Sequence, residues 1–439
     1  MTSRAKRSAL ASLAGLACLP MLACSASPDR PTTIEVLNWW TEKGESSALQ
    51  ALLDLFMSMH PQQHVHSTPV KGSSAARDTI RKRMIAGQPP DTFQANGGLG
   101  LFAWVLYNNI NDADTKLEPI DDLYAAEGWT TLFPDPVLET VSVNGHAYAV
   151  PLNIHRENTL YYNKRLFAAA GVTLPPTTLD ELFAVAEILK SKGITPIALG
   201  AGDSWTLQLL LFENLLISRA GGAYYHDFFL GHGNPLGPEM STAVDDLARL
   251  LSYTNTDALS LGWSDAVDLV GQGEAAMVIM GDWARGRLKA TMANLEDIGE
   301  VAMPGTAGTF VFTTDTFGLP KGAPNREGTR DLLRLFGSKE GQNTFNPLKG
   351  SISARSDAIM DSEDAKLYDA KAQQTIFDFR SATSLVPATA ILAPQEFIDA
   401  VDSALAQFAG AGNAAVVGNK SIVLHTIDNW FDMLPANPW

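Results

Sequence analysis

The stretch Ile34–Glu45 (IEVLNWWTEKGE) limits the fold of this chain more than any other part of the sequence. Its apolar start predicts a buried strand of a parallel sheet. The strand leads through two adjacent tryptophans and a polar turn into a helix predicted over 47–60, capped by Ser46 or Ser47 and ended by Pro61. A buried strand followed directly by a helix is the opening unit of an α/β fold.

The alternation of strand and helix continues after this unit. The pattern predicts a strand over 65–70, a helix over 75–86, a strand over 92–94 and a helix over 99–107. This βαβαβ order predicts a doubly wound sheet with flanking helices. With 439 residues, 46% of them hydrophobic, the chain is long enough for two such domains.

A second α/β region follows a predicted β-hairpin over 141–150. The hairpin surrounds Asn144-Gly145, a pair typical of the type I′ turn. Beyond Pro151 the sequence predicts strands over 160–164, 194–199 and 275–280 and helices over 165–170 and 178–190, the second opened by a capping box of Thr178 and Glu181. The interrupted pattern resumes with strands over 310–312 and 317–319 and a helix over 326–336, and the tail over 395–407 and 422–433 is helical.

The N-terminus has the features of an export signal. Three basic residues precede an apolar run over 9–23, which is too short to span a membrane as a helix. Met21-Leu22-Ala23-Cys24 resembles a bacterial lipoprotein cleavage box, so Cys24 is the predicted lipidation site, with ordinary cleavage after Ala23 or Ala26 as the alternative. We therefore expect an exported protein, periplasmic or at the cell surface and anchored by lipid.

The two cysteines and the charge narrow the function further. Cys18 and Cys24 both fall in the leader, so the mature protein is expected to form no internal disulfide. The formal net charge is −16, and such a surface repels phosphate, which argues against nucleic acid and anionic membranes as partners. No run after the leader is long and apolar enough to span a membrane. A neutral small molecule is the ligand that this charge favours.

The residues after the first strand predict a binding site for a sugar. Ligands of open α/β sheets bind beyond the carboxyl ends of the strands, where Trp39, Trp40 and Glu45 would lie. The C–H face of a sugar stacks on an indole, and its hydroxyls bind carboxylates and amides. The alternative is that both tryptophans belong to the core.

No sequence motif indicates catalysis. The chain has no G-x-S-x-G elbow, no H-E-x-x-H zinc helix and no Walker A loop, and His60, His64 and His66 surround a turn rather than form a metal site. We expect neither a metal nor a cofactor. A glycosidase needs only two carboxylates, so the motifs alone leave that alternative open.

Three further stretches place polar or aromatic residues at predicted strand ends and turns. The apolar strand over 275–280 delivers Asp282 and Trp283, and Asp282 either binds ligand or caps the next helix. Asp315 lies at a predicted crossing between domains, and Lys349 lies in a predicted turn. Both can make charge-assisted hydrogen bonds to sugar hydroxyls, or they form a salt bridge with each other.

These stretches together resemble a known family. The phrases are an early strand with aromatics, PPDTFQ, YAVPLNIHRENTLYYNKRLFAAAGV, PPTTLDEL, GQGEAAMVIMGDWA and NPLKGSISAR, in that order over roughly 34–430. They resemble the extracellular solute-binding proteins of ABC-type carbohydrate importers, in the branch of the glucose/mannose-binding lipoproteins.

The resemblance implies a two-lobed, type II periplasmic-binding-protein-like fold with a hinge of several chain crossings. The expected division is a leader and tether over 1–33, a first lobe over 34–149 with 310–350, and a second lobe over 150–309 with 351–439. The resemblance implies these ligand-pocket residues: Trp39, Trp40, Glu45, Gln94, Asn96, His155, Trp263, Trp283, Asp315 and Lys349. Asp282 joins the predicted set only through its place at the end of the strand over 275–280.

Two positions depart from the family pattern. The turn after the tryptophans is one residue longer here, so Glu42 is an alternative to Glu45. Glucose-binding relatives carry a pocket histidine late in the chain, whereas the matching stretch 384–389 has none, which leaves the exact sugar open.

The sequence therefore predicts a monomeric binding protein, not an enzyme. It would capture a neutral sugar similar to glucose, mannose or galactose between its lobes and deliver it to the membrane permease subunits of an ABC importer. The alternatives are a secreted glycoside hydrolase or lyase, and a sensory or scaffold lipoprotein.

Overall fold

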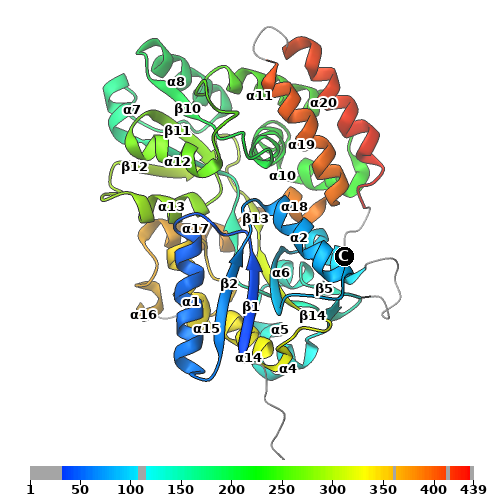
Figure 1. Cartoon of the computed structure of the whole chain (residues 1–439). Helices are drawn as coiled ribbons and strands as arrows, with labels where there is room; N and C mark the ends of the chain where they lie inside the picture. Colours follow the sequence, from blue (N-terminus) through cyan, green and yellow to red (C-terminus); the bar gives the residue numbers. More distant parts are fainter. Residues whose placement is uncertain (1–31, 107–114, 359–361, 412–415, 436–439) are drawn as a thin grey trace, which may run out of the picture.

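The computed structural model describes residues 32–106, 115–358, 362–411 and 416–435. These residues form two α/β lobes, with the first below the second in Figure 1. The predicted export leader and Cys24 lie outside the described residues. Within the described part of the chain, no helix has the length and apolar character needed to cross a membrane.

The first lobe is built on a mixed sheet of strand order β2-β1-β3-β14-β4, with β7 also paired to β14. The strands are β1 (Thr33–Asn38), β2 (His64–Pro69), β3 (Thr92–Asn96), β4 (Leu117–Glu118), β7 (Ala149–Pro151) and β14 (Asp315–Pro320). The first three are parallel, as predicted, whereas β14 is antiparallel to its neighbours because the chain re-enters this sheet from the second lobe. The helices are α1 (Glu45–Met59), α2 (Ser73–Ile85), α3 (Leu99–Val105), α4 (Asp121–Glu127), α5 (Trp129–Leu132), α6 (Asp135–Glu139), α14 (Arg326–Gly337) and α15 (Lys339–Lys349).

Of two local features predicted in the first lobe, a hairpin is present and a helix cap is not. The hairpin of β5 (Ser142–Val143) and β6 (His146–Ala147) is confirmed, with positive φ at Asn144 (52°) and Gly145 (81°). The expected serine cap of α1 is wrong, since the helix starts two residues earlier, at Glu45, after Gly44 at φ 95°. A Cβ on Gly44 would lie 2.7 Å from the backbone of Gly286 in the other lobe, so the position needs glycine.

The second lobe has a four-stranded sheet of order β10-β11-β9-β12. Its strands are β9 (Thr159–Asn163), β10 (Thr195–Ala198), β11 (Ala275–Met280) and β12 (Ile298–Ala302). Every residue of β11 is buried, as its continuous apolar run predicts, and the capping box at the start of α8 is confirmed. The helices are α7 (Lys164–Ala170), α8 (Leu179–Ser191), α9 (Trp205–Gln208), α10 (Ile217–Asp227), α11 (Pro238–Leu251), α12 (Trp263–Gln272), α13 (Trp283–Thr291), α18 (Thr389–Leu392), α19 (Gln395–Gly410) and α20 (Val416–Phe431), with two π-helical runs, Leu209–Leu216 and Phe228–His232.

A three-stranded sheet, β15-β13-β8, lies where the chain passes between the lobes. It consists of β8 (His155–Arg156), β13 (Thr309–Thr313) and β15 (Ser384–Pro387). Phe310 and Phe312 of β13 pack in the first core and Val311 packs in the second. Because successive side chains of a strand point to opposite faces, this one strand joins both cores.

The segment after α15 divides between the lobes differently from the expected boundary. Tyr368, and Ala372 and Ile376 of α17 (Ala370–Ser381), pack in the first core, with the short helix α16 (Ser362–Ala365) before them. Only the part from β15 onwards supplies most of its buried residues to the second core. The expectation that all of 351–439 belongs to the second lobe is therefore wrong for this part.

Candidate functional site

A cleft of about 990 Å³ lies between the lobes and is lined by residues of both. Ten of the eleven predicted binding residues line it: Trp39, Trp40, Glu45, Gln94, Asn96, His155, Trp263, Trp283, Asp315 and Lys349. The eleventh, Asp282, does not. The structure thus brings together residues that are as far apart in the sequence as 39 and 349.

Aromatic side chains form one wall on each lobe. Trp40 is only 2% exposed and packs on Phe317 and Phe345, with ring centroids 5.7 and 5.1 Å away. It is therefore both a core residue and part of the cleft lining, so the two interpretations of the sequence were not exclusive. The backbone of Trp39 is fixed because its N–H donates to Gln94 Oε1 at 3.1 Å.

The aromatic wall of the second lobe is larger than predicted. Trp283 makes edge contacts with Trp205 and Trp263, at centroid distances of 5.8 and 6.5 Å. Trp205 also lines the cleft, and sequence reasoning did not select it. The available signal was its place just beyond the carboxyl end of β10, where ligands of α/β sheets bind.

Lys349 is held by a buried ion pair across the first lobe. Its Nζ lies 2.9 Å from Glu45 Oε1 and 5.6 Å from the ring centre of Trp40. Lys349 ends α15 and Glu45 begins α1, and these two helices pack against each other. The predicted alternative of a Lys349–Asp315 salt bridge is therefore wrong, as is the expectation that Lys349 lies in a turn. Burial raises the pKa of Glu45, although the charge of Lys349 opposes that shift.

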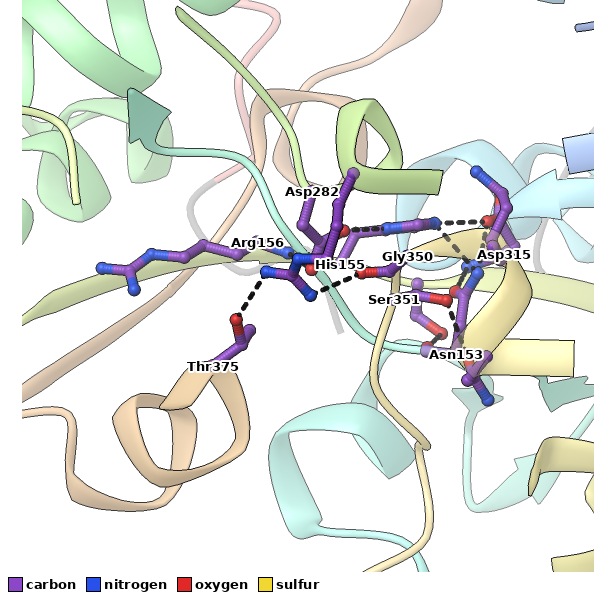
Figure 2. A network of polar contacts seen from close by, with 12 residues as sticks. Asn153, His155, Arg156, Asp282, Asp315, Gly350, Ser351 and Thr375 are labelled. Carbon is purple, nitrogen blue, oxygen red and sulfur yellow. Dashed lines mark hydrogen bonds and ion pairs between the residues drawn. The ribbon is translucent and has the colours of Figure 1, made fainter. Parts of the chain in front are cut away.

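Asp315 is the centre of a hydrogen-bonded network (Figure 2). Gln94 Nε2 and Asn153 Nδ2 each donate to its carboxylate at 2.7 Å, and His155 Nε2 lies 3.3 Å from it. Burial alone would raise the pKa of Asp315, but the hydrogen bond and charge of His155 outweigh it and bring the pKa to about 2. The group is therefore an anion at neutral pH.

Asp282 has a structural role that the sequence did not suggest. It accepts hydrogen bonds from the ring Nδ1 of His155 and from the backbone N–H of Arg156, the second at 3.0 Å, and its side chain makes no cap bond to α13. The helix-cap interpretation of Asp282 is wrong, and its side chain lies outside the cleft lining, because it satisfies the chain crossing at β8. Burial and Lys349 lower the pKa of His155, but Asp282 and Asp315 overcome them and the net pKa is raised.

The other connection between the lobes, after α15, is also held by a buried charged side chain. Arg285 of α13 donates to the carbonyl of Gly350 and to Thr375 Oγ1, both at 3.0 Å (Figure 2), and forms an ion pair with Glu300. Arg285 is 4% exposed. It thus connects the second lobe to the segment that follows α15, near the cleft.

Glu42 lies at the edge of the cleft and pairs with the opposite lobe. Its carboxylate is 3.3 Å from Arg287 of α13, which makes a closer, two-pronged pair with Asp268 at 3.0 and 2.6 Å. Between the two candidates from the sequence, Glu45 is the one beside Trp40 and Lys349.

Two buried acids line the cleft that sequence reasoning did not find. Glu157 follows β8, and Glu213 lies inside the π-helical run Leu209–Leu216; they are 6% and 4% exposed. A charged residue within the apolar run LLLFENLL was the signal for Glu213, because an isolated buried acid usually has a function or a partner. No three His, Cys, Asp or Glu side chains come together as metal ligands in the part of the chain described.

The comparisons with known proteins agree with this geometry. Residues 39–343 match the family described as bacterial extracellular solute-binding protein. An uncharacterised extracellular-binding protein of an ABC transporter from Pyrococcus horikoshii is 35% identical over 384 residues, which cover 86% of this chain and 83% of that protein. A probable sugar-binding periplasmic protein from Brucella suis is 31% identical over 380 residues, or 85% of this chain and 86% of its own.

Solved structures confirm the two-lobed type II fold. A chitin oligosaccharide binding protein superposes with a TM-score of 0.78 at 21% identity, covering 93% of this chain and all of its own. A bacterial solute receptor described as preferring β-D-galactopyranose has a TM-score of 0.77 at 19% identity, over 91% of this chain and 99% of its own. These relatives are binding proteins rather than enzymes. The chain therefore belongs to the family of bacterial extracellular solute-binding proteins.

Proposed function

We propose that this protein captures a sugar in the cleft between its lobes and delivers it to the permease of an ABC importer. The observation that carries the proposal is the composition of the cleft, where tryptophans on both lobes face buried carboxylates, amides and a lysine. Indole rings stack on the C–H face of a sugar, and charged groups bind its hydroxyls. The names of the relatives from Brucella and other bacteria support a sugar as the solute.

The proposed ligand is a hexose of the glucose, mannose or galactose kind. We propose that Trp39, Glu45, Gln94, Asp315 and Lys349 bind it from the first lobe and that Trp263 and Trp283 cover it from the second. Asn96 and His155 line the same cleft and complete the proposed set. Export and lipidation at Cys24 would hold the protein at the membrane, next to its permease.

A thermal-shift screen against mono- and disaccharides tests the proposal. A ligand that binds only the folded state stabilises it by about 3–4 kcal/mol at 100 to 1,000 times its dissociation constant. A rise in melting temperature with at least one hexose supports the function, and no rise with any sugar contradicts it.

Small-angle scattering tests the proposed mechanism. Because ligand groups come from both lobes, bound sugar favours the closed arrangement over the open one. The radius of gyration should decrease when sugar is added, and an unchanged radius at saturating sugar would count against hinge closure.

A glycoside hydrolase is the second candidate, because Glu157 and Glu213 place two carboxyl groups in the cleft. Incubation with disaccharides and aryl glycosides, followed by chromatography, separates the two functions. Recovery of the sugars unchanged after many equivalents of incubation would exclude the hydrolase.

A further inference from the structure

Glu157 and Glu213, the acid pair, differ from every other acidic group discussed above. Neither forms an ion pair within the described residues, and the carboxyl of Glu157 accepts no hydrogen bond there. Glu213 Oε1 accepts from the backbone N–H of Thr389 at 3.0 Å, while its Oε2 is shielded from solvent and has no partner. A buried carboxyl without a partner is unfavourable, so this site lacks a hydrogen-bond donor.

Two neighbouring parts of the lining show the same deficit. Gln208 Oε1, just before the π-helical run, is also buried and lacks a donor, and Gln208 lines the cleft. Thr313 Oγ1 at the end of β13 is buried in the lining without any partner, and as a hydroxyl it can either donate or accept. Thr389 is the residue that reaches Glu213, through its backbone N–H and its side chain, and its hydroxyl also lies 3.2 Å from Tyr225 Oη. It does not line the cleft, and Glu213 Oε2 still has no partner.

The charge of the cleft points in the same direction. Eleven aspartates and glutamates line it, against four lysines and arginines. Among the buried acids, Glu45 is balanced by Lys349 and Asp315 by His155, whereas the acid pair has only distant charges. A cleft lined by one sign of charge concentrates ligands of the opposite sign.

We propose that the acid pair binds the protonated amine of an amino sugar, a hexose such as glucosamine or galactosamine. An ammonium group brings a positive charge and three N–H donors, which two carboxyls and a nearby amide oxygen can accept. A hydroxyl brings one donor and no charge, and an acetamido group brings one donor and no charge. This inference rests on the proposed function and replaces the expectation of a neutral ligand.

Binding of an amine should displace protons from the acid pair. Burial, followed by the charge of Glu213, raises the pKa of Glu157 well above its usual range, and burial raises the pKa of Glu213 to about 7. Asp282 and Asp315 act on Glu157 in the same direction and Lys349 opposes them, and Tyr225 is the titratable group beside Glu213. The acid pair is therefore protonated in part at pH 7, and a bound cation would displace protons from it.

Calorimetry of the wild-type protein at pH 7 is the first test. Glucosamine and galactosamine should bind about tenfold or more tightly than glucose and galactose, and N-acetylglucosamine should bind no better than glucose. Titrations in two buffers of different ionisation enthalpy should show release of up to about one proton per amino sugar bound and none for glucose.

The second test uses Glu157→Gln, which removes the charge and keeps the shape. The preference for the amino sugar should fall to about threefold or less, with glucose affinity changed little. The matched control is Glu340→Gln, an exposed acid in the first turn of α15 outside the cleft lining, which should keep the preference. If Glu157→Gln does not fold, the wild-type comparison and the proton count still decide.

The outcomes separate this inference from the proposed function. Equal or tighter binding of glucose by the wild type, or a full preference in Glu157→Gln, would overturn the amine site while the sugar-binding function stands. In that case a shared proton on the acid pair bonds a hydroxyl of a neutral sugar. Absence of binding by every sugar tested would overturn both.

Discussion

Two sets of buried polar residues share one cleft and differ in how they are satisfied. In the paired network, Lys349 meets Glu45 at 2.9 Å and Asp315 accepts from Gln94 and Asn153 at 2.7 Å. In the acid pair, Glu213 Oε2 has no partner. Both sets are buried to a similar degree, so burial by itself does not reveal which groups await a ligand.

The difference follows from what each set does for the free protein. The paired network joins α1, α15, β14 and the crossing at β8, so its hydrogen bonds hold the two lobes and the walls of the cleft in place. The acid pair joins no elements by charge. Burying these two carboxyls without a cation lowers the stability of the fold. Such an arrangement is typical of a site that is built for binding rather than for stability.

Lys349→Met should break the paired network with the largest effect. Glu45 would remain buried without its cation, and loss of one partner of a buried pair costs about 3–5 kcal/mol of unfolding free energy. Urea denaturation at pH 7 measures this loss. The double variant Glu45→Gln/Lys349→Met should recover much of it, and a single variant as stable as the wild type would show that the pair contributes nothing.

Glu213→Gln should raise the free energy of unfolding, the opposite of Lys349→Met, and the size of the effect should depend on pH. The pKa of Glu213 in the fold is about 7, above its usual 4.5, so its favourable contribution is complete below about pH 4.5 and is lost as the pH rises through 7. The variant lacks this loss and should gain about 2 kcal/mol over the wild type between pH 5 and pH 8.

Urea denaturation without sugar at these two pH values measures the gain, and the exposed Glu340→Gln is the control. Parallel pH profiles for the wild type and Glu213→Gln would mean that Glu213 is not held protonated by the fold.

Trp283→Ala tests a cleft residue that belongs to neither the paired network nor the acid pair. Trp283 contacts Trp205, Trp263 and His155 and lines the cleft, so its loss should weaken binding by about 2 kcal/mol, or about thirtyfold. The loss should be equal for amino sugars and neutral sugars, because stacking does not depend on the amine. Calorimetry measures both, and Trp430→Ala, outside the cleft lining, is the control.

If Trp283→Ala unfolds the protein, Trp283 is mainly a core residue rather than a ligand contact. An unequal loss for the two sugar types would place the amine next to Trp283 instead of the acid pair.

Glu42→Gln should have the smallest effect. Glu42 is a partly exposed partner of Arg287, which keeps its closer pair with Asp268, and such pairs contribute about 0.2–1 kcal/mol. Unfolding free energy and sugar affinity should both stay within about 1 kcal/mol of the wild type. A larger loss of affinity would make Glu42, rather than Glu45, the acid that faces the ligand.

The parts that the sequence determined are those with a local physical cause. The strand over 275–280 was predicted with its observed bounds because six consecutive apolar residues must be buried. The turn at Asn144-Gly145 and the cap at Thr178 were predictable because each depends on a few adjacent residues. The ordered family phrases predicted ten residues that do line the cleft.

The tertiary structure alone decided which charged groups meet. Lys349 is 304 residues from Glu45, and Asp282 is 127 from His155, so no periodicity relates either pair. Glu157 and Glu213 likewise line one cleft and interact through their charges although they come from different elements. Pairings of this kind depend on how whole helices and strands pack, which is set by many weak contacts at once, and no short stretch of sequence contains that information.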